Sequence, residues 1–267
     1  MLALGARRNR VNPMTASLPL AEIADNDPSY GLRLHEALNH LRDAAYDRDD
    51  ILQFMAFAMP LARKSKAQLF QDLWALWVNG GKRGGYFVEF GAADGLNLSN
   101  TWMLEKEMGW SGLLAEPNPA FHEALARERD CEVSHKCVYS RSGETVDFMA
   151  ARHGEFSRIA SISPEDSHEE KRQRTSTTIA VETISLNDLL IERKAPRRID
   201  FMSVDTEGSE FEILSQFDFD RWEVAAIAVE HNKTPARERL AGLLTAKGYR
   251  RMWVPVSRFD DWYVKAE

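Results

Sequence analysis

Hydrophobic and polar positions divide the chain into a helical first part and a second part in which strands and helices alternate. Apolar residues recur at helical spacing from Tyr30 to Leu41, and again over 51–62 and 68–78. Asn79 is followed by two glycines, and glycine after the last periodic residue is a typical helix C-terminal cap. The pattern therefore predicts an N-terminal helical extension over residues 29–82.

From residue 83 onward, β-rich runs alternate with helical segments, which predicts βαβ units and a mostly parallel sheet. The expected strands cover 86–90, 112–115, 131–139, 199–204 and 224–229, with an added strand at 145–150. The expected helices cover 98–108, 120–128, 209–217 and 235–247. Two closing strands at 249–255 and 262–265 are separated by too few residues for a parallel crossover, so they form an antiparallel hairpin.

Composition narrows the functional class. With 267 residues and 44% hydrophobic residues, the chain is one large domain or a domain with an appendage, and it is not disordered throughout. The 34 Lys and Arg against 41 Asp and Glu give a net charge of −7, whereas a generic nucleic-acid binder needs a basic excess. We therefore expect a small-molecule partner and no nucleic acid.

The compartment is also suggested by the sequence. Cys131 and Cys137 form no metal-binding pair and are too few for a disulfide framework, which favours a cytoplasmic protein with reduced thiols. The longest apolar run, 51–62, is too short to span a membrane. Residues 1–28 are polar, basic and without periodicity, which predicts a disordered leader rather than a secretory signal.

In an open α/β sheet, ligands bind beyond the carboxyl ends of the strands, so the residues just past each strand are the candidates for function. The first strand is followed by the pattern Glu-x-Gly-x-x-x-Gly over 89–95. This pattern places acidic groups where a diphosphate would need amide donors, and it suits a cationic ligand such as S-adenosylmethionine (SAM). An ordinary turn between a strand and a helix is the alternative.

The second strand ends at Glu116, which follows Gly95 by 21 residues. A carboxylate at this position can accept hydrogen bonds from both hydroxyls of an adenosine ribose. Together with Gly91 and Gly95, it predicts an adenosyl-binding site, with NAD as the competing ligand.

Two further strands end in acidic and polar residues. Asp205 and Glu207 follow the fourth core strand, where helix capping is the alternative interpretation. The fifth core strand ends in Glu230, His231 and Asn232, a set that packing alone does not explain.

These runs resemble the FkbM family of SAM-dependent methyltransferases. The similarity extends over about residues 65 to 265, and its most specific element is the Asp-x-Glu-Gly run at 205–208. Other matching runs are 68–73, 86–95, 99–101, 104–106, 109–110, 114–117, 183–190 and 199–204. The resemblance implies an α/β fold, namely a seven-stranded, Rossmann-like SAM-dependent methyltransferase sheet with an antiparallel C-terminal hairpin. The predicted domains are then 1–28, 29–82 and 83–267.

The resemblance also implies roles for individual residues. Asp205 would face the methyl group and the acceptor, and Glu116 would hold the ribose. Residues expected along the methionine end of SAM are Glu89, Gly91, Asp94, Gly95 and Asn97. Residues expected near the adenine are Pro117, Asn118 and Val138 with its neighbours up to Ser140.

The catalytic candidates are Asp205, His231 and Glu207, and two routes for activating an alcohol acceptor are open. His231 has a side chain whose ordinary pKa suits a general base near neutral pH. Alternatively, Asp205 and Glu230 could hold Mg²⁺, with Asn232 as a further ligand, since these are hard oxygen donors.

Methyltransferases that act on amino groups often carry Asn/Asp-Pro-Pro-aromatic after the fourth strand, and residues 205–208 do not match it. Oxygen is therefore the expected acceptor, and the family resemblance suggests a hydroxyl of a sugar, glycan or polyketide-like molecule. A nicotinamide oxidoreductase and a SAM-fold protein without catalysis remain as alternatives.

The charged segment 152–178 is expected to be an exposed loop or a lid over the acceptor, with Arg152, His153 and Arg158 as candidate contacts. The helical extension offers a surface for a homodimer.

Overall fold

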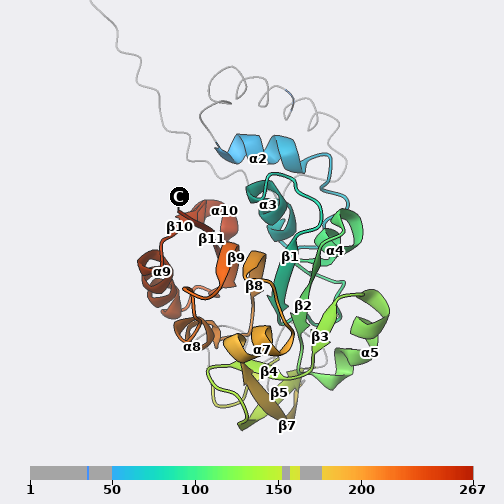
Figure 1. Cartoon of the computed structure of the whole chain (residues 1–267), viewed down its shortest axis with the longest axis vertical. Coiled ribbons are helices and arrows are strands. Elements are labelled where there is room, and N and C mark those ends of the chain that lie inside the picture. The colour runs from blue at the N-terminus through green and yellow to red at the C-terminus, as the bar shows by residue number, and fades with distance from the viewer. Residues whose placement is uncertain (1–34, 36–49, 152–156, 163–175, 267) are drawn as a thin grey trace, which may run out of the picture. The chain divides into compact units, whose positions relative to one another are not determined.

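Figure 1 shows the fold as a computed structural model, which describes residues 35, 50–151, 157–162 and 176–266. The predicted leader 1–28, Arg152, His153 and residues 163–175 lie outside the described residues. The chain divides into two units, Met1–Leu52 and Gln53–Glu267, and the second contains both sheets. The domain boundaries proposed from the sequence stay predictions.

A seven-stranded sheet forms the centre of the second unit, in the order β10-β11-β9-β8-β1-β2-β3. Strands β3, β2, β1, β8 and β9 pair in parallel, whereas β11 is antiparallel to both β9 and β10. The strands are β1 (Tyr86–Phe90), β2 (Ser111–Ala115), β3 (Glu132–Ser134), β8 (Arg198–Val204), β9 (Glu223–Glu230), β10 (Tyr249–Met252) and β11 (Asp260–Lys265). The predicted mostly parallel sheet with a C-terminal antiparallel hairpin is confirmed.

Hydrophobic clusters cover both faces of this sheet. Val88 packs on one face with α7, α8 and α9, and Phe87 packs on the other with α3, α4 and α5, because successive strand residues point to opposite faces. The helices are α2 (Asp50–Ala58), α3 (Gln71–Val78), α4 (Trp102–Met108), α5 (Pro119–Glu128), α7 (Leu186–Glu192), α8 (Glu210–Ser215), α9 (Ala236–Ala246) and α10 (Val254–Ser257). No described helix has the length and apolar character needed to cross a membrane.

Helix α3 lies in the predicted N-terminal extension, yet it belongs to the core. Trp74 is fully buried and stacks on Trp262 of β11 with ring centroids 5.1 Å apart. The helix ends at Val78, as the Asn79-Gly80-Gly81 run predicts. The C-terminal hairpin is therefore packed against a segment that precedes the first strand by only a few residues.

A second, four-stranded sheet corrects the predicted third strand. Residues 131–139 do not form one strand: the chain leaves the large sheet after Ser134 and enters the second sheet at Cys137. The polar turn between them is held by the Lys136 amide, which donates to Ser134 Oγ over 3.3 Å. The second sheet has the order β4-β7-β5-β6, with β4 (Cys137–Tyr139), β5 (Thr145–Ala151), β6 (Arg158–Ile159) and β7 (Ser176–Ser185).

Three other boundaries also differ from the sequence-based expectation. Residues 176–178 were expected in an exposed loop but begin β7, where they pair with β5. The first closing strand ends at Met252 because Trp253 adopts a left-handed backbone with φ 43°. The helix expected from residue 98 begins at Trp102, since Leu98 has φ 60° and cannot continue a right-handed helix.

Candidate functional site

A cavity of about 670 Å³ lies at the carboxyl ends of β1, β2, β8 and β9. This is where ligands bind in parallel α/β sheets. Its lining includes six carboxylates and, among the described residues, no lysine, arginine or histidine. The carboxylates are Glu89, Asp94, Glu116, Asp205, Glu207 and Glu230.

Glycine at position 91 permits the loops after β1 and β8 to approach closely. Gly91 has φ 74°, and a Cβ atom there would lie 1.9 Å from the backbone oxygen of Asp205. Only glycine fits both the left-handed backbone and this contact. The Glu-x-Gly pattern thus reflects packing of one strand end against the next, and this packing brings the Asp205 loop to the cavity.

Glu89 shapes the loop that follows it. Its carboxylate accepts hydrogen bonds from the Asn100 amide at 2.7 Å, Thr101 Oγ1 at 2.5 Å and Ser99 Oγ at 3.1 Å. The buried Arg129 guanidinium lies 3.6 Å from the same carboxylate. Glu89 is therefore occupied by protein donors, although it still lines the cavity.

Arg129 is a site-supporting residue that the sequence pattern does not reveal. Its guanidinium donates to the Gly95 carbonyl, to Ser99 Oγ and to Thr101 Oγ1, and it pairs with Glu105 at 2.6 Å. One buried cation thereby fixes both ends of the loop 95–101. Since Arg129 follows the end of α5, far from Glu89 in sequence, no local spacing predicts this pairing.

Asp94 and Asn97 close the turn between these residues. Asp94 Oδ1 accepts from the amides of Leu96 and Asn97, and Asp94 Oδ2 accepts from Asn97 Nδ2 at 2.6 Å. Both side chains line the cavity, and their contact with the methionine end of SAM stays a prediction.

Glu116 stands at the end of β2 with its carboxylate held by backbone amides. Oε2 accepts from the Ala93 amide at 2.9 Å, and Oε1 accepts from the Asn118 amide at 2.8 Å. Burial raises the pKa of this carboxyl to about 7, despite the two amide donors. Each oxygen retains a lone pair for a further donor.

The residues expected near an adenine divide into two groups. Pro117 and Val138 line the cavity, next to the apolar side chains of Phe121, Phe148 and Ile159. Val138 does so from the second sheet and not from the third strand of the large sheet.

Asn118 has a structural position instead. It is buried, accepts from the Ala120 amide as the N-cap of α5, and donates to the Ala151 carbonyl at 2.9 Å and to Ser157 Oγ at 3.2 Å. It is not part of the cavity lining, and it ties the second sheet to the loop after β2.

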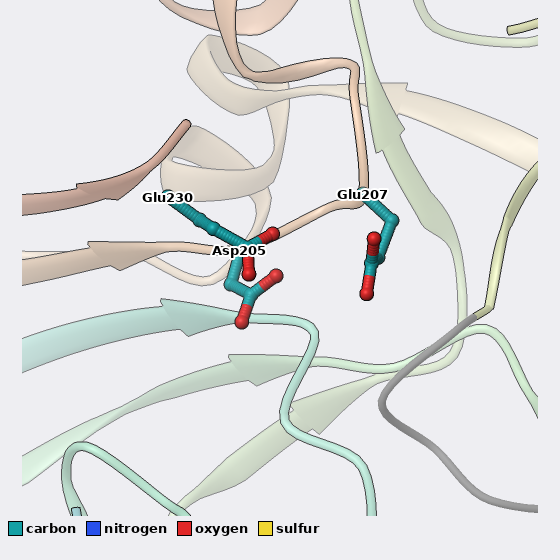
Figure 2. Close-up of side chains that lie close together, drawn as sticks. All are labelled: Asp205, Glu207 and Glu230. Atoms are coloured by element: carbon teal, nitrogen blue, oxygen red, sulfur yellow. The ribbon is translucent and has the colours of Figure 1, made fainter. Parts of the chain in front are cut away.

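Asp205, Glu207 and Glu230 form the acidic trio of the site (Figure 2). Carboxylate oxygens from the three residues all lie within 4.8 Å of one another. Glu207 adopts a left-handed backbone with φ 57°, a strained conformation for a residue other than glycine and one found most often at functional sites. The set of oxygens is of the kind that a hard divalent cation prefers.

Electrostatics within the trio favour a shared proton when no cation is bound. Burial raises the pKa of Glu230 well above its ordinary value, and the negative charges of Asp205 and Glu207 and a hydrogen bond to Asp205 raise it further. Two neighbouring carboxylates cannot both ionise without a compensating charge.

Glu210 holds the loop that presents the trio. Its fully desolvated carboxylate accepts from the Thr206 amide at 2.9 Å, the Gly208 amide at 3.0 Å and Thr206 Oγ1 at 3.1 Å. These donors belong to the loop before α8, and the N-cap residue of this helix, Ser209, makes no side-chain cap hydrogen bond. Sequence reasoning did not select this residue, although its place in the first turn of a helix is the signal for it.

His231 is not brought into the cavity. Its side chain is 1% exposed, Nδ1 accepts from the Lys233 amide at 2.9 Å, and Nε2 lies 3.0 Å from the Asp260 carbonyl oxygen. Burial lowers the pKa of the ring. Both nitrogens are thus engaged with the backbone, and the ring connects β9 to β11. Its role as a general base stays a prediction from sequence, and this geometry does not favour it.

Arg158, a candidate contact for the acceptor, is buried in the second sheet. Its guanidinium donates to the backbone carbonyls of Ile159, Ala160 and Ile162.

Comparison with known proteins identifies the family of this chain. A sequence model described as the methyltransferase FkbM domain matches residues 89–259, more than half of the chain. The chain belongs to the FkbM methyltransferase family. All the site residues selected from the sequence lie within the matched FkbM domain, from Glu89 to His231.

The other comparisons add little to the family assignment. The precorrin-6y C5,15-methyltransferase of Geobacter metallireducens GS-15 is a structural neighbour with 11% identity and a TM-score of 0.38, covering 73% of this chain and 87% of its own. The comparison with curated proteins found no match.

Three acids in or next to the FkbM domain have a pKa raised to about 7: Asp72, Glu116 and Asp260. In each case burial is the main cause, because it disfavours the charged form. Each acid therefore stabilises the folded state while it is protonated there. This stabilisation is fully present below the pKa that the acid has in the unfolded chain, and it is lost as pH rises through about 7. Their contribution to the free energy of unfolding should therefore fall between about pH 4 and pH 7.

Asp72 offers a direct test, because its side chain is fully buried and Oδ2 has no hydrogen-bond partner. Asp72→Asn keeps an oxygen for the Ser65 hydroxyl and the Leu73 amide and removes the titration. Chemical denaturation should show wild type losing stability relative to the variant by about 1 kcal/mol per pH unit between pH 5 and pH 7. The exposed Glu123→Gln is the control, and parallel pH profiles for wild type and Asp72→Asn would refute the assignment.

Proposed function

We propose that this protein is a SAM-dependent O-methyltransferase that acts on a hydroxyl of a sugar, glycan or polyketide-like molecule through a Rossmann-like sheet. The observation that carries the proposal is the Glu116 carboxylate, fixed at the cavity wall by two backbone amides and buried. Burial removes the water that would donate hydrogen bonds to this carboxylate. Two ribose hydroxyls would replace these donors and would stabilise the charged form of Glu116.

The competing NAD interpretation is disfavoured by the same contact. A diphosphate needs backbone amides at the turn after the first strand. Here the Ala93 amide donates to Glu116, and Asp94 and Glu116 place negative charge at this turn. A ligand with a sulfonium and an ammonium suits this environment, whereas a diphosphate would be repelled.

The cavity lining offers residues suited to each of the three parts of SAM. The turn from Gly91 to Asn97 would take the methionine end, and Glu116 would take the ribose. The apolar wall of Phe121, Val138, Phe148 and Ile159 would take the adenine. When bound, SAM supplies a methyl group that is already activated, so the protein's main task is to place the acceptor in line with it.

The acidic trio is the part of the site that can activate an acceptor, which favours an enzyme over a protein that only binds. We assign Asp205, Glu207 and Glu230 to Mg²⁺ binding, because their carboxylate oxygens all lie within 4.8 Å of one another. A bound Mg²⁺ would lower the pKa of the acceptor hydroxyl. Glu210 would keep the loop in place, and His231 would position β9 against β11.

Removal of the Glu116 carboxylate tests the cofactor assignment. Glu116→Gln loses the charge that accepts both ribose hydroxyls, so SAM affinity measured by titration calorimetry should fall about 10-fold or more. Glu123→Gln, an exposed change on α5, should leave SAM affinity unaltered. A dissociation constant within twofold of wild type for both Glu116→Gln and Glu116→Ala would contradict the proposal.

Metal dependence tests the role of the trio. Methyl transfer should stop on treatment with a chelator and return with Mg²⁺, and Asp205→Asn should reduce kcat by roughly 100-fold or more with SAM binding retained. His231→Gln should lower the melting temperature and leave kcat nearly unchanged. Chelator-resistant transfer that is lost in Asp205→Asn would indicate a carboxyl base instead of a metal, and loss of kcat alone in His231→Gln would restore the histidine as the base.

A further inference from the structure

Four short segments that border the cavity are joined to one another, and we call them the cavity rim. They are residues 63–71, 96–100, 232–235 and 253–259, and each contributes to the cavity lining. Three contacts join them, namely the β-bridge between Ala67 and Leu98, the hydrogen bond of 2.6 Å from Gln71 to Asp260, and the hydrogen bond of 3.2 Å from the Asn232 amide to the Phe259 carbonyl. The rim is therefore one connected surface, although its parts are distant in sequence.

The cavity rim is basic, in contrast to the chain as a whole. None of its four segments contains an aspartate or a glutamate, whereas the chain has 41 of them and a net charge of −7. The exposed cations of the rim are Arg63, Lys64, Lys66, Lys233 and Arg258. Lys64 pairs with Glu107, and within the described part of the chain no ion pair holds the other four. The rim thus presents positive charge to the solvent.

Exposed apolar side chains concentrate on the same rim. Seven large hydrophobic residues are exposed among the described residues, and four of them lie here, with exposed fractions of 37% to 43%. They are Phe70, Leu98, Val254 and Val256. The two valines flank the exposed Pro255 on α10, between the two strands of the C-terminal hairpin. A single exposed apolar residue is ordinary, but four on one rim are typical of an interaction surface.

Backbone strain has the same distribution. Nine described residues other than glycine have a positive φ, and six of them belong to the rim. They are Phe70, Leu98, Asn232, Lys233, Trp253 and Arg258. At four of these positions, 70, 98, 233 and 258, the strained backbone holds an apolar or cationic side chain in the solvent. Such positions cost the fold stability and concentrate at sites that bind a partner.

We propose that the cavity rim binds the surface of a lipid bilayer that contains anionic lipids. Apolar side chains on separate segments would enter the boundary between headgroups and acyl chains, and the lysines and arginines would attract the anionic headgroups. The absence of acids from the rim fits this partner, because a carboxylate pressed against an anionic surface would be repelled. The apolar residues lie on three segments, an arrangement that suits a fluid surface better than the shaped surface of a protein.

A bilayer bound to the rim would lie next to the cavity, since the same four segments line it. The inference goes beyond methyl transfer and stands or falls separately from it. A failure to bind SAM would refute the proposed function and leave the membrane surface untouched.

Vesicle sedimentation of the full chain tests the partner directly. We expect the protein to bind vesicles of phosphatidylcholine with about 30% phosphatidylglycerol at least 10-fold more strongly than vesicles of phosphatidylcholine alone. Binding should fall about 5-fold or more when the salt is raised from 0.1 M to 0.5 M, because salt screens the cations. No binding to the anionic vesicles, or equal binding to both kinds, would overturn the inference.

The apolar part of the rim is tested by Val254→Ser/Val256→Ser. This double variant should bind the anionic vesicles about 5-fold or more weakly than wild type, with an unchanged melting temperature. Ile191→Ser is the control, because Ile191 is an exposed apolar residue, 44% exposed, that lies outside the rim. Equal losses in the two variants would refute the assignment to the rim. Self-association that is lost in the valine variant, with no vesicle binding by wild type, would assign the rim to a second copy of the chain instead.

The cationic part is tested by Lys233→Gln/Arg258→Gln, which should weaken binding to the anionic vesicles about 10-fold or more. Lys194→Gln/Arg197→Gln is the matched control, since it removes the same charge from two exposed cations outside the rim, and Lys194 also has a left-handed backbone with φ 51°. The control should stay within twofold of wild type. Equal weakening by both pairs would show that only the overall charge matters and would contradict a docking surface at the rim.

Discussion

The concentration of carboxylates at one end of one sheet is the constraint on which the rest of this structure depends. Burial of Glu116, Asp260 and Glu230 raises the pKa of each, which means that the folded protein holds these groups at a free-energy cost near neutral pH. A cost of this kind persists where a ligand offsets it. A cationic ligand bound at this end of the sheet would offset the negative charge of these carboxylates.

The fold maintains this arrangement with a small number of buried polar contacts outside the cavity. Arg129 lies between Glu89 and Glu105 and fixes the loop after β1, while Glu210 fixes the loop after β8. Gly91 allows the two loops to touch. Asn118 attaches the second sheet to the loop after β2, and Phe148 and Ile159 of that sheet contribute apolar side chains to the cavity lining. The acidic groups can therefore stay close together because their backbones are held by other residues.

The large sheet could be predicted because its strands are short apolar runs that end in glycine or acidic residues. The prediction that Glu116, Asp205 and Glu230 lie at one edge of the sheet followed from the rule that parallel strands end at the same edge. The break between Ser134 and Cys137 could not be predicted, since both halves have strand-like residues and only tertiary pairing separates them. The position of His231 was equally hidden, because its ring bonds to backbone that comes from β11. Arg129 and Gln71 contribute through contacts distant in sequence, which no local pattern encodes.

The central claim is that the acidic cavity at the carboxyl ends of the strands binds a cationic adenosyl ligand in preference to a diphosphate. Titration of the wild-type protein with SAM and with NAD in the same buffer tests it most directly. The account predicts saturable SAM binding with a 1:1 stoichiometry and no detectable heat from NAD at the same concentrations. Saturable binding of NAD, with SAM weaker or absent, would contradict it.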